Sequence, residues 1–126
     1  MYIRFVTTQM DLDSRQPQGL FVASHALLSC FDLTLDDEKR VRAELNWFNE
    51  NLPSPDVPYI TGRVIFWFKS EAQEYIRRMW GLSYILREHG RLTTVQKCRF
   101  LSHVVYRDAY QVAAIPRGRD ANRSYK

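Results

Sequence analysis

Cysteine, histidine and glycine are scarce in this chain of 126 residues, which contains two, three and five of them. Cys30 and Cys98 lie far apart and form no CxxC motif, so we expect two free, reduced thiols rather than a disulfide or a metal site. The histidines show no ligand spacing such as HxxxH, and the isolated glycines form no phosphate-binding loop. Because no catalytic, metal or nucleotide motif is present, we expect no metal and no cofactor.

Long apolar runs are also missing. No stretch approaches the roughly 20 apolar residues that a membrane helix requires. Residues 1–6 have neither the basic start nor the sustained apolar core of a secretory signal. These absences predict a cytoplasmic protein without a membrane partner.

The residues that are present have the composition of a folded protein, since 45% are hydrophobic, 13% are aromatic and 25% are charged. A chain of this length buries one hydrophobic core and needs no disulfide or metal for stability. We expect a single α/β (α+β) domain over residues 1–115. Residues 116–126 have few apolar side chains, and we expect them to form a mobile, basic tail.

Apolar residues at helical spacing predict three helices, over residues 20–30, 34–52 and 70–90. Phe31 is expected to extend the apolar stripe of the first helix. Thr34 is a good N-cap for the second helix, and Ser70 with Gln73 forms a capping box for the third. Gly90 is expected to end the third helix.

Segments rich in β-branched and aromatic residues predict strands, over residues 2–8, 63–68, 92–100, 103–107 and 110–115. The second of these segments is apolar on both faces, as a central strand covered by helices would be. The last two are typical of a hairpin, with Asp108 and Ala109 in the turn. Together the elements predict one mixed sheet of four to five strands packed with about three helices.

Several short strings of the sequence are distinctive as a set, namely YIRFV at residues 2–6, WFN at 47–49, NLP at 51–53, WFK at 67–69, VVYRD at 104–108 and QV at 111–112. In these strings the chain resembles a group of small bacterial proteins that carry no assigned function. The resemblance spans most of residues 2–116. It implies a bacterial single-domain protein. It does not identify any active-site residue in this chain, because none of these strings is a known active-site signature.

The charge is divided unevenly along the chain. Residues 1–62 contain five Lys/Arg against nine Asp/Glu, whereas residues 63–126 contain thirteen against five. Clustered cations attract phosphates and acidic proteins over a Debye length of about 8 Å. The second half is therefore expected to carry a basic surface that faces a partner.

The basic residues of the second half define a candidate nucleic-acid site, because single-strand binders combine a cationic groove with stacking aromatic rings. The candidates are Arg77, Arg78, Arg87, Arg91, Lys97, Arg99 and Arg107, interleaved with Tyr84, Phe100, Tyr106 and Tyr110. The tail adds the least compensated positive charge, on Arg117, Arg119, Arg123 and Lys126. The alternative, which charge mixing within one domain favours, is that the arginines pair with the acidic second helix while the aromatic residues fill the core.

Aromatic residues crowd near the expected element ends, and Trp and Tyr are common anchors of protein interfaces. The candidate anchors are Trp47, Tyr59, Trp80 and Tyr84. We therefore expect a non-enzymatic protein that acts by binding a protein partner or a second copy of itself. Nucleic-acid binding is the second hypothesis, and the third is an enzyme whose site is assembled from distant residues such as His25, His103 and Asp108. An exposed aromatic patch would favour the first hypothesis, a continuous basic face the second, and a pocket lined by perturbed ionisable groups the third.

Overall fold

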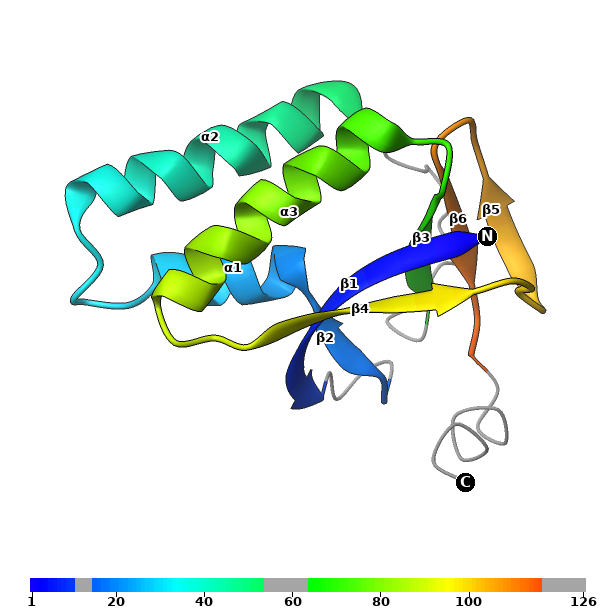
Figure 1. Ribbon diagram of the computed structural model, residues 1–126, viewed down its shortest axis with the longest axis horizontal. Coiled ribbons are helices and arrows are strands. Elements are labelled where there is room, and N and C mark those ends of the chain that lie inside the picture. The colour runs from blue at the N-terminus through cyan, green and yellow to red at the C-terminus, as the bar shows by residue number, and fades with distance from the viewer. Residues whose placement is uncertain (11–14, 54–63, 117–126) are drawn as a thin grey trace.

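The chain folds into three helices and one six-stranded sheet in the computed structural model, which describes residues 1–10, 15–53 and 64–116 (Figure 1). Along the chain the elements are β1 (Tyr2–Met10), β2 (Pro17–Gly19), α1 (Leu20–Leu28), α2 (Leu35–Asn51), β3 (Ile65–Lys69), α3 (Gln73–Glu88), β4 (Thr93–Cys98), β5 (Val104–Arg107) and β6 (Gln111–Ala114). The predicted single-domain α+β fold is confirmed. No helix in the described ranges is long and apolar enough to cross a membrane.

The sheet differs from the predicted one in two respects. It has six strands rather than four to five, and every pairing between the described strands is antiparallel, so the prediction of a mixed sheet is wrong. The additional strand is β2, whose three residues are too few to show an alternating pattern. Parallel pairing does not arise because β3 and β4, which α3 connects, lie on opposite sides of β1 instead of beside each other.

Local sequence signals account for both ends of α2. The Thr34 side chain accepts a hydrogen bond from the Asp37 backbone amide, which confirms the predicted N-cap. Acidic residues at positions 36–38 place negative charge in the first turn, where the helix dipole favours it. Pro53 follows the end of the helix and cannot continue it.

Two other predicted helix ends are wrong. α1 ends at Leu28, and Phe31 is fully exposed beyond it rather than part of the apolar stripe. α3 begins at Gln73 without a side-chain cap, and the Ser70 hydroxyl donates to the Glu71 carboxylate instead. The far end of α3 is as predicted, since Gly90 adopts a positive φ of 78°, which favours glycine.

β1 occupies the centre of the sheet and has three neighbours. One edge of β1 pairs with β4 from Tyr2 to Thr7. The other edge pairs first with β3, at Tyr2 and Ile3, and then with β2, at Val6 and Met10. β3 therefore pairs with β1 at two residues only, whereas it pairs with β6 along most of its length, and β5 follows on the other side of β6 (Figure 1). We call the place where β1 and β3 separate the β1–β3 fork.

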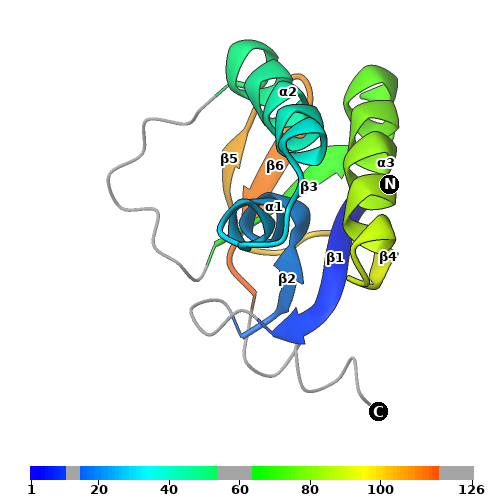
Figure 2. The ribbon, with the colours of Figure 1, turned by 90° about the vertical axis from the view of Figure 1, so that its left-hand side faces the viewer.

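The core lies between the three helices and one face of the sheet. Phe5 of β1 and Phe68 of β3 belong to the same buried cluster as the apolar stripes of all three helices. Figure 2 views the helices nearly end on, with α2 and α3 side by side and α1 close to both. On the opposite face of the sheet Val6, Trp67 and Val112 are also buried. The central position predicted for residues 63–68 is confirmed for β3, which lies between β1 and β6.

Candidate functional site

Two exposed aromatic side chains lie one helical turn apart on the outer side of α3. Trp80 and Tyr84 are 42% and 61% exposed. The Trp80 ring packs edge-on against Phe5, with 5.0 Å between the ring centroids. The core therefore holds one side of the indole in place while its other side faces solvent.

β4 runs beside α3 and extends this surface. The hydroxyls of Ser83 and Thr93 are hydrogen-bonded at 2.5 Å, which joins the helix to the start of the strand. Val95 and Lys97 pair with residues of β1 that face the core. Because directly opposite residues of an antiparallel pair share a sheet face, Val95 and Lys97 lie on the face that carries α3.

We define the α3–β4 face by its aromatic, basic and apolar side chains, which are Trp80, Tyr84, Arg77, Arg87, Lys97 and Val95. Arg87 and Lys97 form no ion pair with the residues that the structure describes. Arg77 donates to both carboxylate oxygens of Glu74, at 2.6 and 2.7 Å, and these hydrogen bonds lower the pKa of Glu74. The face is therefore aromatic at its centre and positively charged at its margins.

Arg78 and Arg91, two of the predicted nucleic-acid residues, have contacts away from this face. Arg78 pairs with Glu44 of α2 at 3.6 Å, and its guanidinium lies 4.7 Å from the centre of the Trp47 ring. Arg91 donates to the Cys30 sulfur at 3.2 Å. Arg78 thus agrees with the alternative interpretation, in which arginines of the basic half pair with the acidic second helix.

The remaining basic candidates are spread over the chain. Arg99 follows the end of β4, and Arg107 lies in β5, at the edge of the sheet remote from β4. Of the predicted basic and aromatic site residues, five lie outside the described residues, namely Tyr59, Arg117, Arg119, Arg123 and Lys126. The predicted tail over residues 116–126 lies outside them except for Pro116. Of the predicted set, Arg77, Arg87 and Lys97 thus lie on the α3–β4 face.

Trp47, a predicted partner anchor, belongs to an aromatic cluster between α2, α3 and the β5–β6 hairpin. Its ring lies edge-on to Phe48 and Tyr75, with 5.2 Å between centroids in each pair. Tyr75 in turn lies 4.5 Å from the Tyr110 ring and donates its hydroxyl to the Asn51 carbonyl. Trp47 therefore stabilises the packing of α2 on α3, away from Trp80 and Tyr84.

Asp108, one of the distant residues of the enzyme hypothesis, organises the turn between β5 and β6. Its carboxylate accepts hydrogen bonds from the Tyr106 hydroxyl at 2.6 Å and from the backbone amides of Tyr110 and Gln111 at 2.8 and 3.0 Å. Burial alone would raise its pKa, but these hydrogen bonds outweigh burial and hold the pKa of Asp108 below its usual value. The same carboxylate raises the pKa of the Tyr106 hydroxyl that donates to it.

The two histidines of the enzyme hypothesis lie on other elements. His25 lies in α1, and His103 precedes β5 with a positive φ of 55°. Within the described part of the chain, no three His, Cys, Asp or Glu side chains gather where they could hold a metal ion. His25, His103 and Asp108 thus lie on different parts of the fold, in α1, before β5 and in the turn between β5 and β6.

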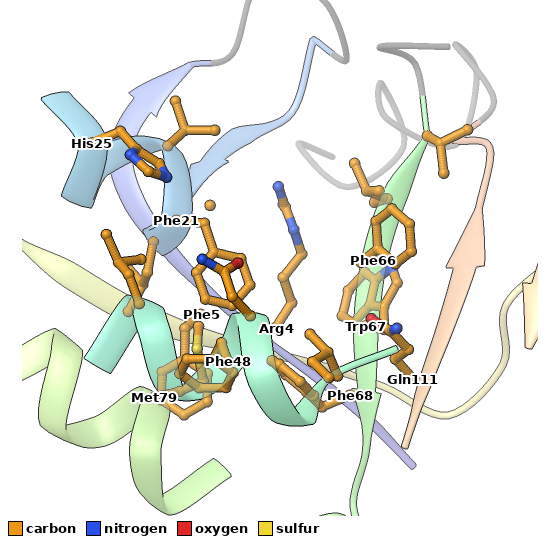
Figure 3. Close-up of a pocket in the computed structure, with 18 of the residues that line it drawn as sticks. Arg4, Phe5, Phe21, His25, Phe48, Phe66, Trp67, Phe68, Met79 and Gln111 are labelled. Atoms are coloured by element: carbon orange, nitrogen blue, oxygen red, sulfur yellow. The ribbon is translucent and has the colours of Figure 1, made fainter. Parts of the chain in front are cut away.

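A cavity of about 410 Å³ opens at the β1–β3 fork (Figure 3). Its walls come from the two fork strands, β2, α1 and α2, together with Met79 of α3 and Gln111 of β6. Apolar side chains dominate these walls, and the aromatic ones include Phe21, Phe48, Phe66 and Phe68. Arg4 of β1 extends into the cavity and donates to the Pro17 carbonyl at 2.7 Å (Figure 3).

Sequence reasoning missed this cavity because its lining residues are scattered from position 4 to position 111. The one signal in the sequence is Arg4, a charged residue inside an otherwise apolar segment at the start of β1. A single sequence does not distinguish such a residue from one that simply faces water, whereas the structure shows that Arg4 is buried.

Comparisons of the chain with protein-family models, with curated proteins and with solved structures gave no match. The resemblance to small bacterial proteins stays a prediction, and the proposals below depend on the geometry of this chain alone.

Proposed function

We propose that the protein is a non-catalytic, cytoplasmic binding protein that contacts another macromolecule through the α3–β4 face. The observation that carries the proposal is the pair Trp80 and Tyr84, which are exposed one turn apart on a helix anchored in the core. A ring that is already held in place, as Trp80 is by Phe5, loses little conformational entropy on binding, and Trp and Tyr often dominate interface energies. A reducing compartment is in keeping with Cys30 and Cys98 as separate free thiols.

We expect the partner to be a protein with an apolar groove and an acidic rim. Because Arg87 and Lys97 form no ion pair with the described residues, acidic groups of a partner would meet cations that are not already neutralised. A second copy of the chain fits less well. Antiparallel packing of two α3 helices about Trp80 and Tyr84 would bring Arg77 of one copy close to Arg87 of the other.

Single-stranded nucleic acid is the second candidate partner, because the same face combines exposed rings with cations at its margins. Bases stack on aromatic side chains while cations neutralise the phosphates. This kind of binding weakens steeply as salt rises, since it releases counterions. The basic residues predicted for the tail would add to it.

Photo-cross-linking in the source cells tests the proposal. A photoreactive phenylalanine analogue replaces Tyr84 in one variant and Leu35 in the control, because Leu35 is 65% exposed in the first turn of α2 and lies outside the α3–β4 face. We expect a discrete protein adduct from position 84 and none from position 35. An RNA or DNA adduct at position 84 would favour the second candidate, and a dimer adduct would favour self-association. Equal labelling from both positions, or none from either, would contradict the proposal.

A further inference from the structure

The cavity at the β1–β3 fork is a consequence of strand pairing. β1 pairs with β3 at Tyr2 and Ile3 and with β2 at Val6. These pairs hold β3 and β2 in place on either side of the gap. Arg4 and Phe5 lie between these pairs and line the cavity. Closing the gap would break main-chain pairs, so a space of about 410 Å³ is built into the fold. This volume falls within the range of roughly 300 to 1,000 Å³ that is usual for small-molecule sites.

The walls of the cavity favour an aromatic ligand. The rings of Phe21, Phe66 and Phe68 line it from α1 and β3, and aromatic rings pack well on one another edge-on or offset. Figure 3 shows the Arg4 side chain between the wall that carries His25 and the wall that carries Phe66. The flat face of a guanidinium stacks on aromatic rings, and this contact does not require its N–H groups.

Gln111 supplies an oriented hydrogen-bond acceptor. Its side chain lines the cavity across from His25 in Figure 3, and the residue is only 3% exposed. Its Nε2 donates to the Pro53 carbonyl at 2.7 Å and to the Asp108 carboxylate at 3.1 Å, so both amide hydrogens are engaged. Its Oε1 accepts no hydrogen bond from the residues that the structure describes. A neutral donor on a ligand would satisfy this acceptor, whereas the nearby Asp108 carboxylate disfavours an anion.

We propose that this cavity binds a small aromatic molecule that carries a neutral hydrogen-bond donor, such as an aromatic hydroxyl or ring N–H group. The ring lies among the phenylalanine side chains and against the face of Arg4, and the donor bonds to Oε1 of Gln111. This site is separate from the α3–β4 face, so the ligand and a macromolecular partner bind to different parts of the fold.

Two matched probes test the ligand chemistry on the unmodified full chain. 1-Naphthol has an aromatic ring system and a hydroxyl donor, and 1-methoxynaphthalene has the same ring system without the donor. We expect 1-naphthol to shift the NMR signals of the Gln111 side-chain amide and of the backbone amides of Phe66 and Phe68. We expect 1-methoxynaphthalene to bind at the same place about fivefold more weakly, because it cannot donate to Oε1.

A pair of variants tests the location. Val22→Trp places a larger side chain at an exposed position that lines the cavity, and Leu92→Trp makes the same change at an exposed position outside it. Because both residues are exposed, we expect both variants to fold. Val22→Trp is expected to weaken 1-naphthol binding about tenfold or more by filling the space, and Leu92→Trp is expected to leave it unchanged.

Three outcomes would overturn the proposal. They are shifts that map to residues outside the cavity lining, absence of saturable binding of 1-naphthol, and equal affinity for the two probes. The first two contradict the site itself, and the third contradicts the role of Gln111. If Val22→Trp fails to fold, the shift map and the comparison of the two probes on the unmodified protein still decide the question.

Discussion

Asp108 shows how one side chain can hold a hairpin turn that contains no glycine. Three hydrogen bonds, from the Tyr106 hydroxyl and from two backbone amides, converge on its carboxylate. A fourth comes from the side-chain amide of Gln111 and connects the turn to the wall of the cavity. The dipeptide Asp-Ala has a weaker backbone preference for a tight hairpin turn than Asp-Gly has. The side chain compensates for this weakness by acting as the acceptor that organises the loop.

Replacing Asp108 by alanine should destabilise the protein by about 2 kcal/mol, because donors to a charged acceptor would lose their partner. Asp108→Asn should cost less, since its amide oxygen still accepts some of these hydrogen bonds. Urea unfolding at neutral pH measures both values. Equal stability of Asp108→Ala and the unmodified protein would show that the carboxylate does not organise the turn.

The same contribution should depend on pH in a defined direction. The folded-state pKa of Asp108 lies below its usual value, so its stabilising effect is fully present above the unfolded-state pKa of about 3.9. The effect is lost as the pH falls through the lower folded-state pKa. The stability difference between the unmodified protein and Asp108→Asn should therefore shrink on acidification below about pH 4. A difference that grows on acidification would contradict this assignment.

At the scale of elements, β3 has two edges in different environments. The Lys69 amide donates to the Tyr110 carbonyl next to β6, and backbone amides alternate in direction along a strand. The amides of Ile65 and Trp67 therefore point to β6, whereas the amide of Phe66 points to the β1–β3 fork, where β1 no longer pairs.

Amide hydrogen exchange under native conditions should detect this difference. We expect slow exchange at Ile65 and Trp67 and clearly faster exchange at Phe66, because only the first two amides lie in a continuous ladder with β6. Val112 of β6 lies directly opposite Trp67 in the antiparallel pair, and its amide serves as an internal reference for slow exchange. Rapid exchange at Ile65 and Trp67 would show that β3 is not a central strand, and uniform protection would show that the fork is closed in solution.

Most elements could be predicted from the sequence because each carries a strong local signal. The apolar stripes of α2 and α3 and the N-cap Thr34 are of this kind. β2 could not be predicted, because its three residues become a strand only through main-chain pairing with β1. The capping box at Ser70 failed because a local pattern does not decide which neighbour the hydroxyl contacts, and here that neighbour is Glu71.

Across the whole molecule, the charge asymmetry of the sequence is partly cancelled where α2 meets α3. Glu44 of α2 pairs with Arg78 of α3 at 3.6 Å, and the Asp37 carboxylate lies 3.1 Å from the His89 ring. Such surface pairs contribute little stability, but they align the two helices. The positive charge that these contacts leave on the outer side of α3 includes Arg87, which belongs to the α3–β4 face.

The two candidate sites differ in how far the sequence could reveal them. Trp80 and Tyr84 lie off the apolar stripe of a clearly predicted helix, so their exposure could be inferred from helical spacing. The cavity could not be inferred, because it depends on where β1 and β3 separate, and this is a property of strand register. Long-range pairing of this kind leaves no local pattern in a single sequence.

The central claim is that the α3–β4 face carries the binding energy for a protein partner. The most direct test uses the partner protein that is identified by cross-linking at position 84. It measures how tightly this partner binds two double variants of the chain. Tyr84→Ser with Arg87→Ser removes a ring and a cation from the face, whereas Leu35→Ser with Arg107→Ser removes an exposed apolar side chain and a cation elsewhere. We predict that the first variant binds about 30-fold or more weakly, as expected for loss of an interface anchor, and that the second binds like the unmodified protein. Equal affinity of the two double variants, both folded, would contradict the claim.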